Sequence, residues 1–332
     1  MFSEKISFDE ICSAHQRIQS YILETPLVLS SSLKEYAGAD IFLKFEHLQK
    51  TGSFKIRGAT NAILRLDHAK KSYGVVGVST GNHGRGLAAA AKAAGIRCII
   101  CMSELVPQNK VDSIRALGAE VRITGKSQDE AQLEVDMLVK KEGMTMIPPF
   151  DDPDVINGQG TLGLEILKSL PEIDLALIPV SGGGLISGVA SAIKSKLPKC
   201  KIVGVSMERG AAMYQSQKVG KPILVKEEKT LADSLGGGIG LDNEYTFKIV
   251  ENLVDDIILV SESEIAEAIR FAYWKEGQVI EGSGAVTLAS LICKKIRPKR
   301  STVALMCGGN IDMKLHYKII SQNIEKKRNQ NA

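Results

Sequence analysis

A lysine bracketed by apolar residues is the strongest candidate for a reactive side chain in this sequence. Lys55 lies between Phe54 and Ile56 in the run TGSFKIRGA, at the start of an apolar-periodic helix. Most lysines are solvated surface charges, but a lysine that is partly removed from water has a lowered pKa and can form a Schiff base with a carbonyl compound. Lys55 is therefore a candidate nucleophile, and a surface charge is the alternative.

One of the glycine-rich turns in the sequence has the features of an anion site. The four turns are STGNHGRG (79–86), SGGGLISG (181–188), LGGGIG (235–240) and CGGN (307–310). In the second, the strand LALIPV runs into three consecutive glycines before a helix that begins near Leu185. Backbone N–H groups at a helix N-terminus can cradle a phosphate, and a tight packing turn is the alternative. The turn lacks the nucleotide P-loop and dinucleotide fingerprints, which disfavours an oxidoreductase.

A phosphate cradle and a Schiff-base lysine together point to one cofactor. Pyridoxal phosphate carries a phosphate and an aldehyde that a lysine amine can capture, and the sequence has no other cofactor signature. The residues themselves therefore predict a pyridoxal-phosphate enzyme.

Alternating strands and helices must position these groups. Strands are expected at 74–79, 97–102 and 120–123, and helices at 87–94, 108–117 and 127–142. The pattern resumes with strands at 175–180, 201–206 and 302–306, and helices at 185–197, 263–275 and 285–294. This alternation predicts doubly wound parallel sheets in about two domains. Between the two blocks, the prolines of MIPPFDDPDVINGQG (146–160) should break any element, so this stretch is interpreted as a domain crossing.

Composition excludes several classes of protein. The formal net charge of the 332 residues is only +4 and 5% of them are aromatic, which argues against nucleic-acid binding. We expect no membrane span and no signal peptide, because no apolar run is long enough for either. Cys98 and Cys101 have C-x-x-C spacing, but residues three apart on a buried strand face opposite sides. With its scattered cysteines, the chain is expected to be cytoplasmic.

The motifs SFKIRGA, STGNHGRG, SGGGLISG and CGGN, in this order, resemble those of the fold-type II pyridoxal-phosphate enzymes. The threonine/serine dehydratases and serine racemases are the most similar branch, and MERGAAM (207–213) and TLADSLGGGIGLDN (230–243) resemble the hydroxyectoine-utilisation dehydratases. The resemblance implies an α/β fold with two doubly wound open twisted sheets, like the tryptophan synthase β-subunit, and the cofactor in the interdomain cleft. The implied units are a large cofactor-binding domain (1–70 and 150–322), a small domain for the substrate carboxylate (71–149) and a frayed tail (323–332).

The resemblance also implies roles for single residues. Lys55 matches the lysine that holds the cofactor and later moves the substrate α-proton, and Phe54 matches the residue that packs against the pyridine ring. Asn82 matches the asparagine that hydrogen-bonds the cofactor's 3′-hydroxyl, and Glu281 a carboxylate near the cofactor. The backbone donors expected to bind the phosphate are Gly182, Gly183, Gly184 and Leu185. The residues expected to bind substrate are Ser79, Thr80, Gly81, Asn82 and His83, with Gly236 and Gly237 in a facing loop.

Cys307 matches the residue that faces the pyridine nitrogen, and its chemistry selects a reaction. A thiol is a weak, neutral donor, unlike a carboxylate that would hold a proton on that nitrogen. A long-lived carbanion suited to transamination is then disfavoured, and prompt loss of a β-leaving group is favoured. We therefore expect an ammonia-lyase that eliminates water from a β-hydroxy amino acid and yields a 2-oxo acid and ammonia. A buried apolar thiol is the alternative for Cys307.

Departures from the family pattern keep other activities open. Thr80 retains a hydroxyl where racemases carry a serine that reprotonates the opposite face, so Thr80 is a second candidate catalytic residue and an amino-acid racemase is an alternative. Glycines at 236–238 replace bulkier residues and predict a pocket for something larger than threonine, as in hydroxyectoine degradation. Racemase-like relatives bind a divalent cation through two carboxylates, but this chain has Ser206 and Ala212 there, which leaves only Glu208 as a nearby ligand.

Some assignments have a structural alternative. His83 is interpreted either as a ligand of the substrate carboxylate or as a structural donor at a helix N-terminus. Glu281 is either a neighbour of the cofactor or a surface helix cap. Arg57 either neutralises a helix end or is a solvated charge. The expected partners are a small amino-acid-like substrate and, by resemblance, further copies of the chain in a homodimer or homotetramer. Neither nucleic acid nor membrane is an expected partner.

Overall fold

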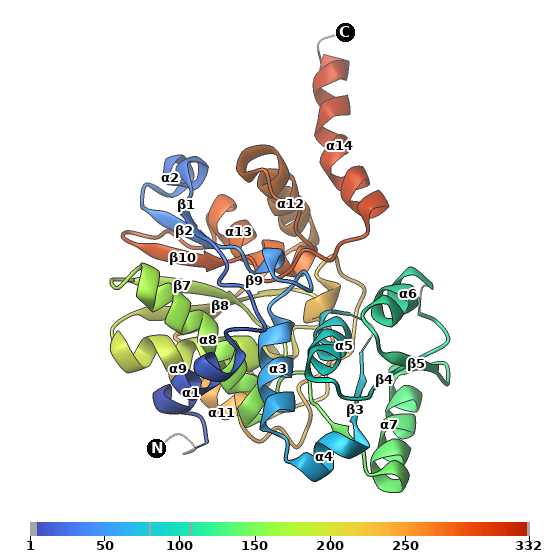
Figure 1. Cartoon of the computed structure of the whole chain (residues 1–332). Helices are drawn as coiled ribbons and strands as arrows, with labels where there is room; N and C mark the ends of the chain where they lie inside the picture. Colours follow the sequence, from blue (N-terminus) through green and yellow to red (C-terminus); the bar gives the residue numbers. More distant parts are fainter. Residues whose placement is uncertain (1–4, 80, 107, 331–332) are drawn as a thin grey trace.

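Two mainly parallel sheets with helices on both faces form the protein (Figure 1). The structure is a computed structural model that describes residues 5–79, 81–106 and 108–330. In spatial order, the larger sheet consists of β1 (Leu27–Leu29), β2 (Ile41–Lys44), β10 (Thr302–Leu305), β7 (Leu175–Pro179), β8 (Lys201–Met207) and β9 (Asp256–Val260). The smaller sheet consists of β5 (Glu120–Ile123), β4 (Cys98–Met102), β3 (Val75–Val78) and β6 (Thr145–Met146). Of the pairings described, β1 with β2 is antiparallel and the others are parallel.

Helices cover both faces of each sheet, as the predicted doubly wound fold requires. The helices around the smaller sheet are α4 (His68–Tyr73), α5 (Asn82–Ala94), α6 (Gln108–Ala116) and α7 (Gln128–Glu142). Those around the larger sheet are α1 (Phe8–Ile18), α2 (Ser31–Ala37), α8 (Pro153–Ser169), α9 (Gly184–Lys196), α10 (Ala212–Val219), α11 (Thr246–Leu253), α12 (Glu262–Glu276), α13 (Gly282–Ile292) and α14 (Met313–Gln330). α3 (Lys55–Arg65) packs between α5 and α8, and its Ala59 and Ile63 belong to an apolar cluster of the smaller sheet. Two short 3₁₀ turns are η1 (Glu46–Leu48) and η2 (Asp233–Leu235).

The cores lie between these layers. One apolar cluster packs α2, α12 and α13 on one face of the larger sheet, and a second packs α8, α9 and α11 on the other. On the smaller sheet, Cys98 packs with Leu87 of α5 while Cys101 packs with Leu138 of α7. The two thiols are free and face opposite sides of β4, as their spacing on a strand predicted.

Close backbone contacts join the helices that carry the predicted site. A Cβ on Gly158 of α8 would lie 2.6 Å from the Cα of Gly58 on α3. A Cβ on Gly188 of α9 would lie 2.3 Å from the carbonyl oxygen of Ile156 on α8. Because no side chains separate these backbones, α8 fixes α3, which begins with Lys55, relative to α9, which begins in the glycine turn.

The segment 146–160 differs from its prediction as a stretch without structure. It crosses between the sheets, but α8 already begins at Pro153, and Oδ1 of Asp152 accepts hydrogen bonds from the backbone N–H groups of Asp154 and Val155 over 2.9 Å each. Proline suits the first helical position, because the N–H it lacks has no partner there. The prolines thus break the chain before residue 153 and start a helix at it.

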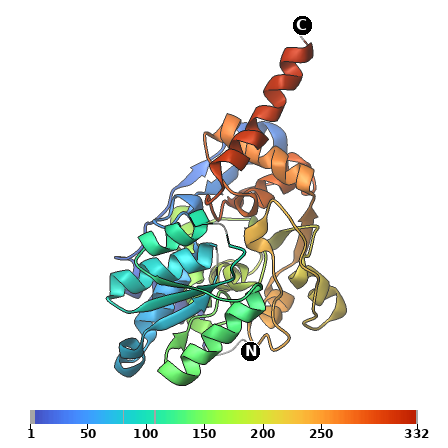
Figure 2. The ribbon, with the colours of Figure 1, turned by 90° about the vertical axis from the view of Figure 1, so that its right-hand side faces the viewer.

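Other boundaries also differ from those predicted. The helix expected at 87–94 begins at Asn82, and β1, β2 and β9 had no counterpart among the predicted strands. α14 covers most of the segment 323–332 that was expected to be a frayed tail, and Figures 1 and 2 show this helix extending away from the sheets. In the described part of the chain, no helix is long and apolar enough to cross a membrane.

Candidate active site

Lys55 begins α3 and points its amine at a backbone carbonyl. Nζ donates to the oxygen of Pro149, in the crossing segment, over 2.7 Å, and lies 5.4 Å from the centre of the Phe54 ring. Burial lowers the pKa of Lys55 from 10.5 to about 8. Among the described ion pairs none involves Lys55, so no carboxylate counteracts this loss of solvation. At pH 7.5 roughly a quarter of such amines are neutral and nucleophilic.

The glycine turn between β7 and α9 has no room for side chains. A Cβ on Gly182 would lie 2.3 Å from the ring of Phe150, and one on Gly184 would lie 2.9 Å from the Cα of Phe150. Gly183 has φ +91°, a backbone conformation that favours glycine. Tight packing, the alternative proposed for this turn, is thus real. The same geometry leaves the first N–H groups of α9, including that of the buried Leu185, at a positively polarised helix end, and this cradle fits a phosphate.

Backbone contacts bring Cys307 and Gly308 next to Ser53 and Phe54, the two residues that precede Lys55. The N–H of Phe54 donates to the carbonyl of Cys307 over 3.2 Å, and Ser53 forms an isolated bridge with Gly308. The Cys307 thiol donates to the carbonyl oxygen of Ser283 over 3.3 Å. Burial, followed by the charge of Glu281, raises the pKa of this thiol, which keeps it neutral. The residues predicted to hold the ring and its nitrogen therefore lie in one place.

Asn82 and Glu281 meet although they are 199 positions apart in the chain. Asn82 Nδ2 donates to Glu281 Oε1 over 2.6 Å, and the side chain of Ser283 also donates to that oxygen. Glu281 precedes α13 but is only 3% exposed, so the surface helix cap considered from the sequence is wrong. Burial is the largest cause of its raised pKa.

His83 has a structural partner. Its Nε2 lies 2.9 Å from the carbonyl oxygen of Ile147, to which it can only donate. Burial, with a contribution from the positive charge of Lys55, lowers the pKa of His83 to about 3. A neutral ring whose N–H is already used has no proton to offer a carboxylate. This contact favours the structural alternative for His83.

The loops predicted to receive the substrate are only partly described. Ser79 Oγ accepts from the N–H of Gly81 over 3.3 Å, whereas Thr80 lies outside the described residues. In the loop that contains Gly236 and Gly237, Gly237 has φ +94° and a Cβ on it would meet nothing within 4 Å. A Cβ on Gly238 would also meet nothing within 4 Å. On Gly236 a Cβ would come within 3.2 Å of Glu227.

A buried ionic cluster that includes Arg57, in the first turn of α3, was not predicted from the sequence. Arg57, two positions further along α3, donates to Oε2 of Glu46 over 2.8 Å and to Oε1 of Glu165 over 2.6 Å, and Lys44 donates to Oε2 of Glu165 over 2.6 Å. Arg57 is fully buried, which overturns its interpretation as a helix-end or solvated charge. Single charges inside apolar runs, such as IFLK and LGLEIL, are the sequence signal that could have revealed this cluster.

The residues considered for a metal do not converge. Ser206 Oγ donates to the carbonyl of Val180 over 2.8 Å, and Glu208 lies 3.8 Å from the amine of Lys295. Among the described residues, no group of three His, Cys, Asp or Glu side chains could hold a metal ion.

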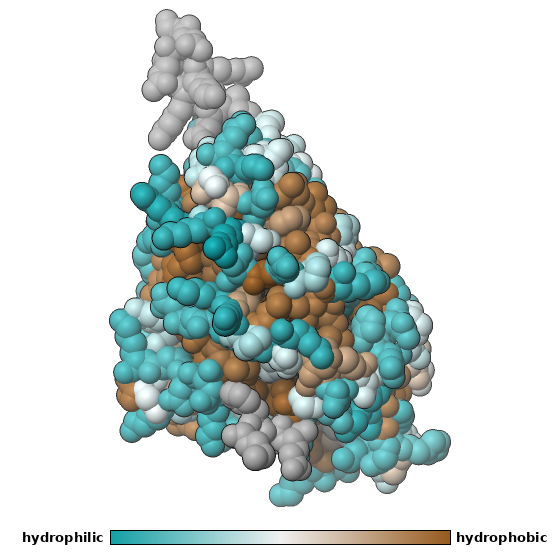
Figure 3. All heavy atoms as spheres, turned by 90° about the vertical axis from the view of Figure 1, so that its left-hand side faces the viewer, coloured by the Kyte–Doolittle hydropathy of each residue, from teal (hydrophilic) through white to brown (hydrophobic). Residues whose placement is uncertain are grey.

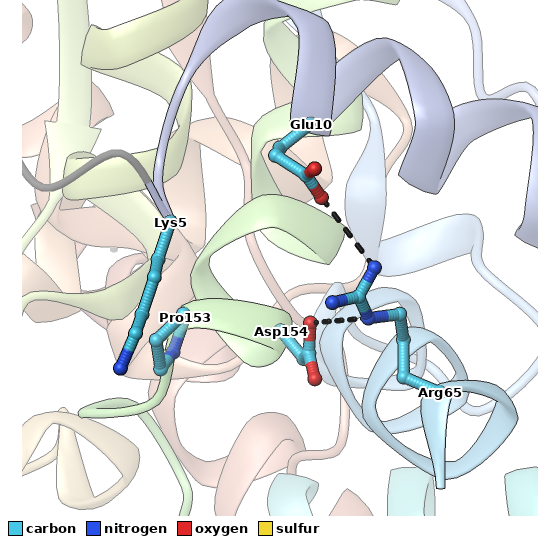
Figure 4. Close-up of a pocket in the computed structure, with 5 residues that line it drawn as sticks. All are labelled: Lys5, Glu10, Arg65, Pro153 and Asp154. Carbon is cyan, nitrogen blue, oxygen red and sulfur yellow. Dashed lines mark ion pairs between the residues drawn. The ribbon is translucent and has the colours of Figure 1, made fainter. Parts of the chain in front are cut away.

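A surface hollow of about 410 Å³ lies away from this site (Figure 4). It is lined by Lys5, Glu10, Arg65, Pro153 and Asp154. Arg65 forms ion pairs with Asp154 at 3.0 Å and Glu10 at 3.6 Å. Because Arg65 ends the helix that Lys55 begins, the helical rise places it roughly 15 Å away along the axis.

Comparison with known proteins identifies relatives along nearly the whole chain. The sequence profile of the family described as "Pyridoxal-phosphate dependent enzyme" matches residues 18–308. A putative threonine dehydratase of Sinorhizobium fredii is 53% identical over 95% of this chain and 96% of its own. An L-threonine ammonia-lyase of Thermotoga maritima is 40% identical over 97% of this chain and 80% of its own. The structure of maize serine racemase superposes with a TM-score of 0.90 at 34% identity, covering 98% of this chain and 99% of the racemase.

Proposed function

The chain belongs to the family of pyridoxal-phosphate dependent enzymes, and on this basis we propose that it is a threonine/serine dehydratase. The reaction removes water from the β-hydroxy amino acid, and the enamine released is hydrolysed to a 2-oxo acid and ammonia. The relatives named threonine dehydratase and L-threonine ammonia-lyase support this assignment.

The residues present fit the cofactor. When bound, pyridoxal phosphate draws electrons from the amino acid so that its α-proton becomes acidic. Lys55 supplies the amine that holds it, and the N-terminus of α9, where three consecutive glycines carry no side chains, suits its phosphate. Phe54 and Asn82 are the proposed neighbours of its ring and 3′-hydroxyl.

Lys55 is the proposed base for the α-proton. Its pKa of about 8 leaves enough neutral amine near neutral pH to accept the proton. The carbonyl oxygen of Pro149, 2.7 Å away, then accepts a hydrogen bond from the resulting ammonium group.

The environment of Cys307 is the observation that favours elimination. The thiol is buried and its proton is directed at the carbonyl of Ser283, so this position offers no negative charge to a pyridine nitrogen. Without a carboxylate there, the ring nitrogen is poorly protonated and transamination is disfavoured. Prompt loss of the β-hydroxyl group is favoured instead.

The test uses protein reconstituted with pyridoxal phosphate. Borohydride should fix the cofactor's mass on the peptide that contains Lys55, and L-threonine or L-serine should release equal amounts of 2-oxo acid and ammonia. Lys55→Ala should lose both properties, and Lys50→Ala, a change of an exposed neighbouring lysine, should keep them. Full turnover by Lys55→Ala would refute the assignment.

The same assay can identify the preferred substrate, for which the loop at Gly236–Gly238 suggests an alternative to threonine. Open space at Gly237 and Gly238 would admit a substrate larger than threonine. Hydroxyectoine as the preferred substrate would support the dehydratase of hydroxyectoine degradation instead. Chiral analysis of unreacted serine separates a racemase, because a racemase leaves both enantiomers.

We also propose that the protein is cytoplasmic and forms a homodimer or homotetramer. The edge strand β1 exposes Val28 by 43% and Leu29 by 47%, and Figure 3 shows apolar side chains gathered in a band on the corresponding side of the molecule. Exposed apolar surface of this kind favours association. Light scattering on the purified protein would give the mass of the assembly.

A further inference from the structure

Asn310 ends the CGGN segment, and its side chain has a fixed orientation. Nδ2 donates to Oδ1 of Asn82 over 2.7 Å and to the carbonyl of Thr51 over 2.9 Å. Oδ1 accepts from Arg85 Nη1 over 3.2 Å. If the amide were turned round, its oxygen would face two other oxygens and its nitrogen a guanidinium group. The partners therefore allow one orientation.

Glu281 holds Asn82 from the other side. One carboxylate oxygen accepts from Asn82 Nδ2 over 2.6 Å, and the other accepts from the backbone N–H of Asn310 over 3.1 Å. Asn310, Asn82 and Glu281 thus form a closed ring of hydrogen bonds. An inverted Asn82 amide would place oxygen against carboxylate and nitrogen against nitrogen, so the ring also fixes Asn82.

The ring leaves one hydrogen of Asn82 only weakly bonded and therefore available to a ligand. Of the two on Nδ2, the first goes to Glu281, and the second has only a contact of 3.4 Å with the hydroxyl of Ser234, at the long limit of a hydrogen bond. Asn82 begins α5 on the smaller sheet, whereas Asn310 follows β10 and Glu281 precedes α13 on the larger one. The ring therefore crosses from one sheet unit to the other.

We propose that Asn310 is a positioning residue that holds the Asn82 amide with its second, weakly bonded N–H towards the cofactor's 3′-oxygen. This inference rests on the proposed function, because it needs pyridoxal phosphate bound beside Asn82. A donor at the 3′-oxygen favours the ionised form of that oxygen. The pH at which the absorption of the bound cofactor changes therefore depends on the orientation of Asn82.

The variant Asn310→Asp tests this. Aspartate has nearly the same shape, but it places a second oxygen against the Thr51 carbonyl and Asn82 Oδ1, which turns or releases the Asn82 amide. In the holoenzyme we expect the pH midpoint of the visible absorption band to rise by about one unit, because the ionised oxygen loses its donor. The dissociation constant for pyridoxal phosphate should increase about tenfold. Asn310→Ala, which adds no charge, should shift both quantities in the same directions.

The matched control is Asn157→Asp. Asn157 is also a buried asparagine, but its Nδ2 donates to the backbone oxygen of Lys5 over 2.8 Å, outside the ring. This variant should lower the melting temperature and leave the midpoint and the dissociation constant unchanged.

The outcomes separate the two proposals. Variants at Asn310 that melt earlier but keep the wild-type midpoint and dissociation constant would show a purely structural role and overturn this inference alone. A wild-type protein that takes up no pyridoxal phosphate would overturn the proposed function as well.

Discussion

Replacing Arg57 by methionine should destabilise the protein by several kcal/mol. Arg57 is fully buried between Glu46 and Glu165, and Lys44 is the other cation of the cluster. The four charges cancel. Without the guanidinium, two buried carboxylates share one ammonium, and breaking a buried pair in this way costs about 3–5 kcal/mol.

The corresponding shift in melting temperature follows from the length of the chain. An unfolding entropy of about 2.1 cal/mol/K per residue gives roughly 0.7 kcal/mol/K for 332 residues. A loss of about 4 kcal/mol therefore lowers the melting temperature by about 6 °C. Calorimetry of wild type and variant under identical cofactor saturation is the assay.

Arg65→Met is the matched control on the same helix. The Arg65 side chain is 43% exposed, and it pairs with Glu10 and Asp154 at the surface. Exposed pairs are worth about 0–1 kcal/mol, so this variant should melt within about 1–2 °C of wild type. Equal shifts for the two arginine variants would refute the argument that burial decides the cost.

A second change tests whether charge balance is the cause. Arg57→Met combined with Glu46→Gln leaves Lys44 and Glu165 as a neutral pair, so the double variant should be more stable than the sum of the single effects by about 1–3 kcal/mol. Additive effects would show that Arg57 contributes through packing alone.

The contribution of Glu46 to the pH dependence of stability should have opposite signs in the wild type and in Arg57→Met. Burial acts to raise the pKa of Glu46, but Arg57 outweighs it and the pKa is lowered from 4.5. Its contribution is therefore present above pH 4.5 and is lost as the pH falls through the folded-state pKa. In Arg57→Met the Glu46 carboxyl is buried without the guanidinium group. Its ionisation above pH 4.5 should therefore destabilise the fold instead of stabilising it.

Two further outcomes follow from the candidate site. The rate at which protein stripped of cofactor captures pyridoxal phosphate should rise with a midpoint near pH 8, because only the neutral Lys55 amine reacts; a stopped-flow midpoint above pH 10 would contradict its pKa. Gly183→Ala should weaken binding of the cofactor by about tenfold or more, because φ +91° and contacts at 2.9 Å with Met213 and Thr246 oppose a side chain. Gly220→Ala, with φ +78° and nothing within 4 Å, should be strained but bind normally, and equal affinities for the two variants would argue against the phosphate cradle.

Features set by neighbouring residues could be predicted from the sequence. Apolar runs of β-branched residues gave the strands around 75–78, 175–179 and 302–305, because a parallel strand buried on both faces must be apolar throughout. That Cys98 and Cys101 lie on opposite sides of their strand followed from the two-residue period alone. Lys55 and the glycine turn were recognisable because their chemistry depends on adjacent positions.

The residues at which helices begin were harder to predict from the sequence. Asn82 and His83 were expected in a loop, yet both lie in the first turn of α5. Pro153 was expected to break structure and instead starts α8. A helix end depends on which N–H groups find acceptors, and composition alone does not contain that information.

The sequence by itself thus determined the alternation of strands and helices, and it contained the candidate reactive lysine and the glycine turn proposed to bind a phosphate. Only the tertiary structure decided which distant side chains neutralise or orient one another. Asn82 meets Asn310 over 228 positions, and Arg57 meets Glu165 over 108. Buried polar groups must find partners wherever the fold supplies them, because leaving them unpaired costs more than any local preference. Local patterns specify the elements, and packing of the two sheet units assigns these polar groups their partners.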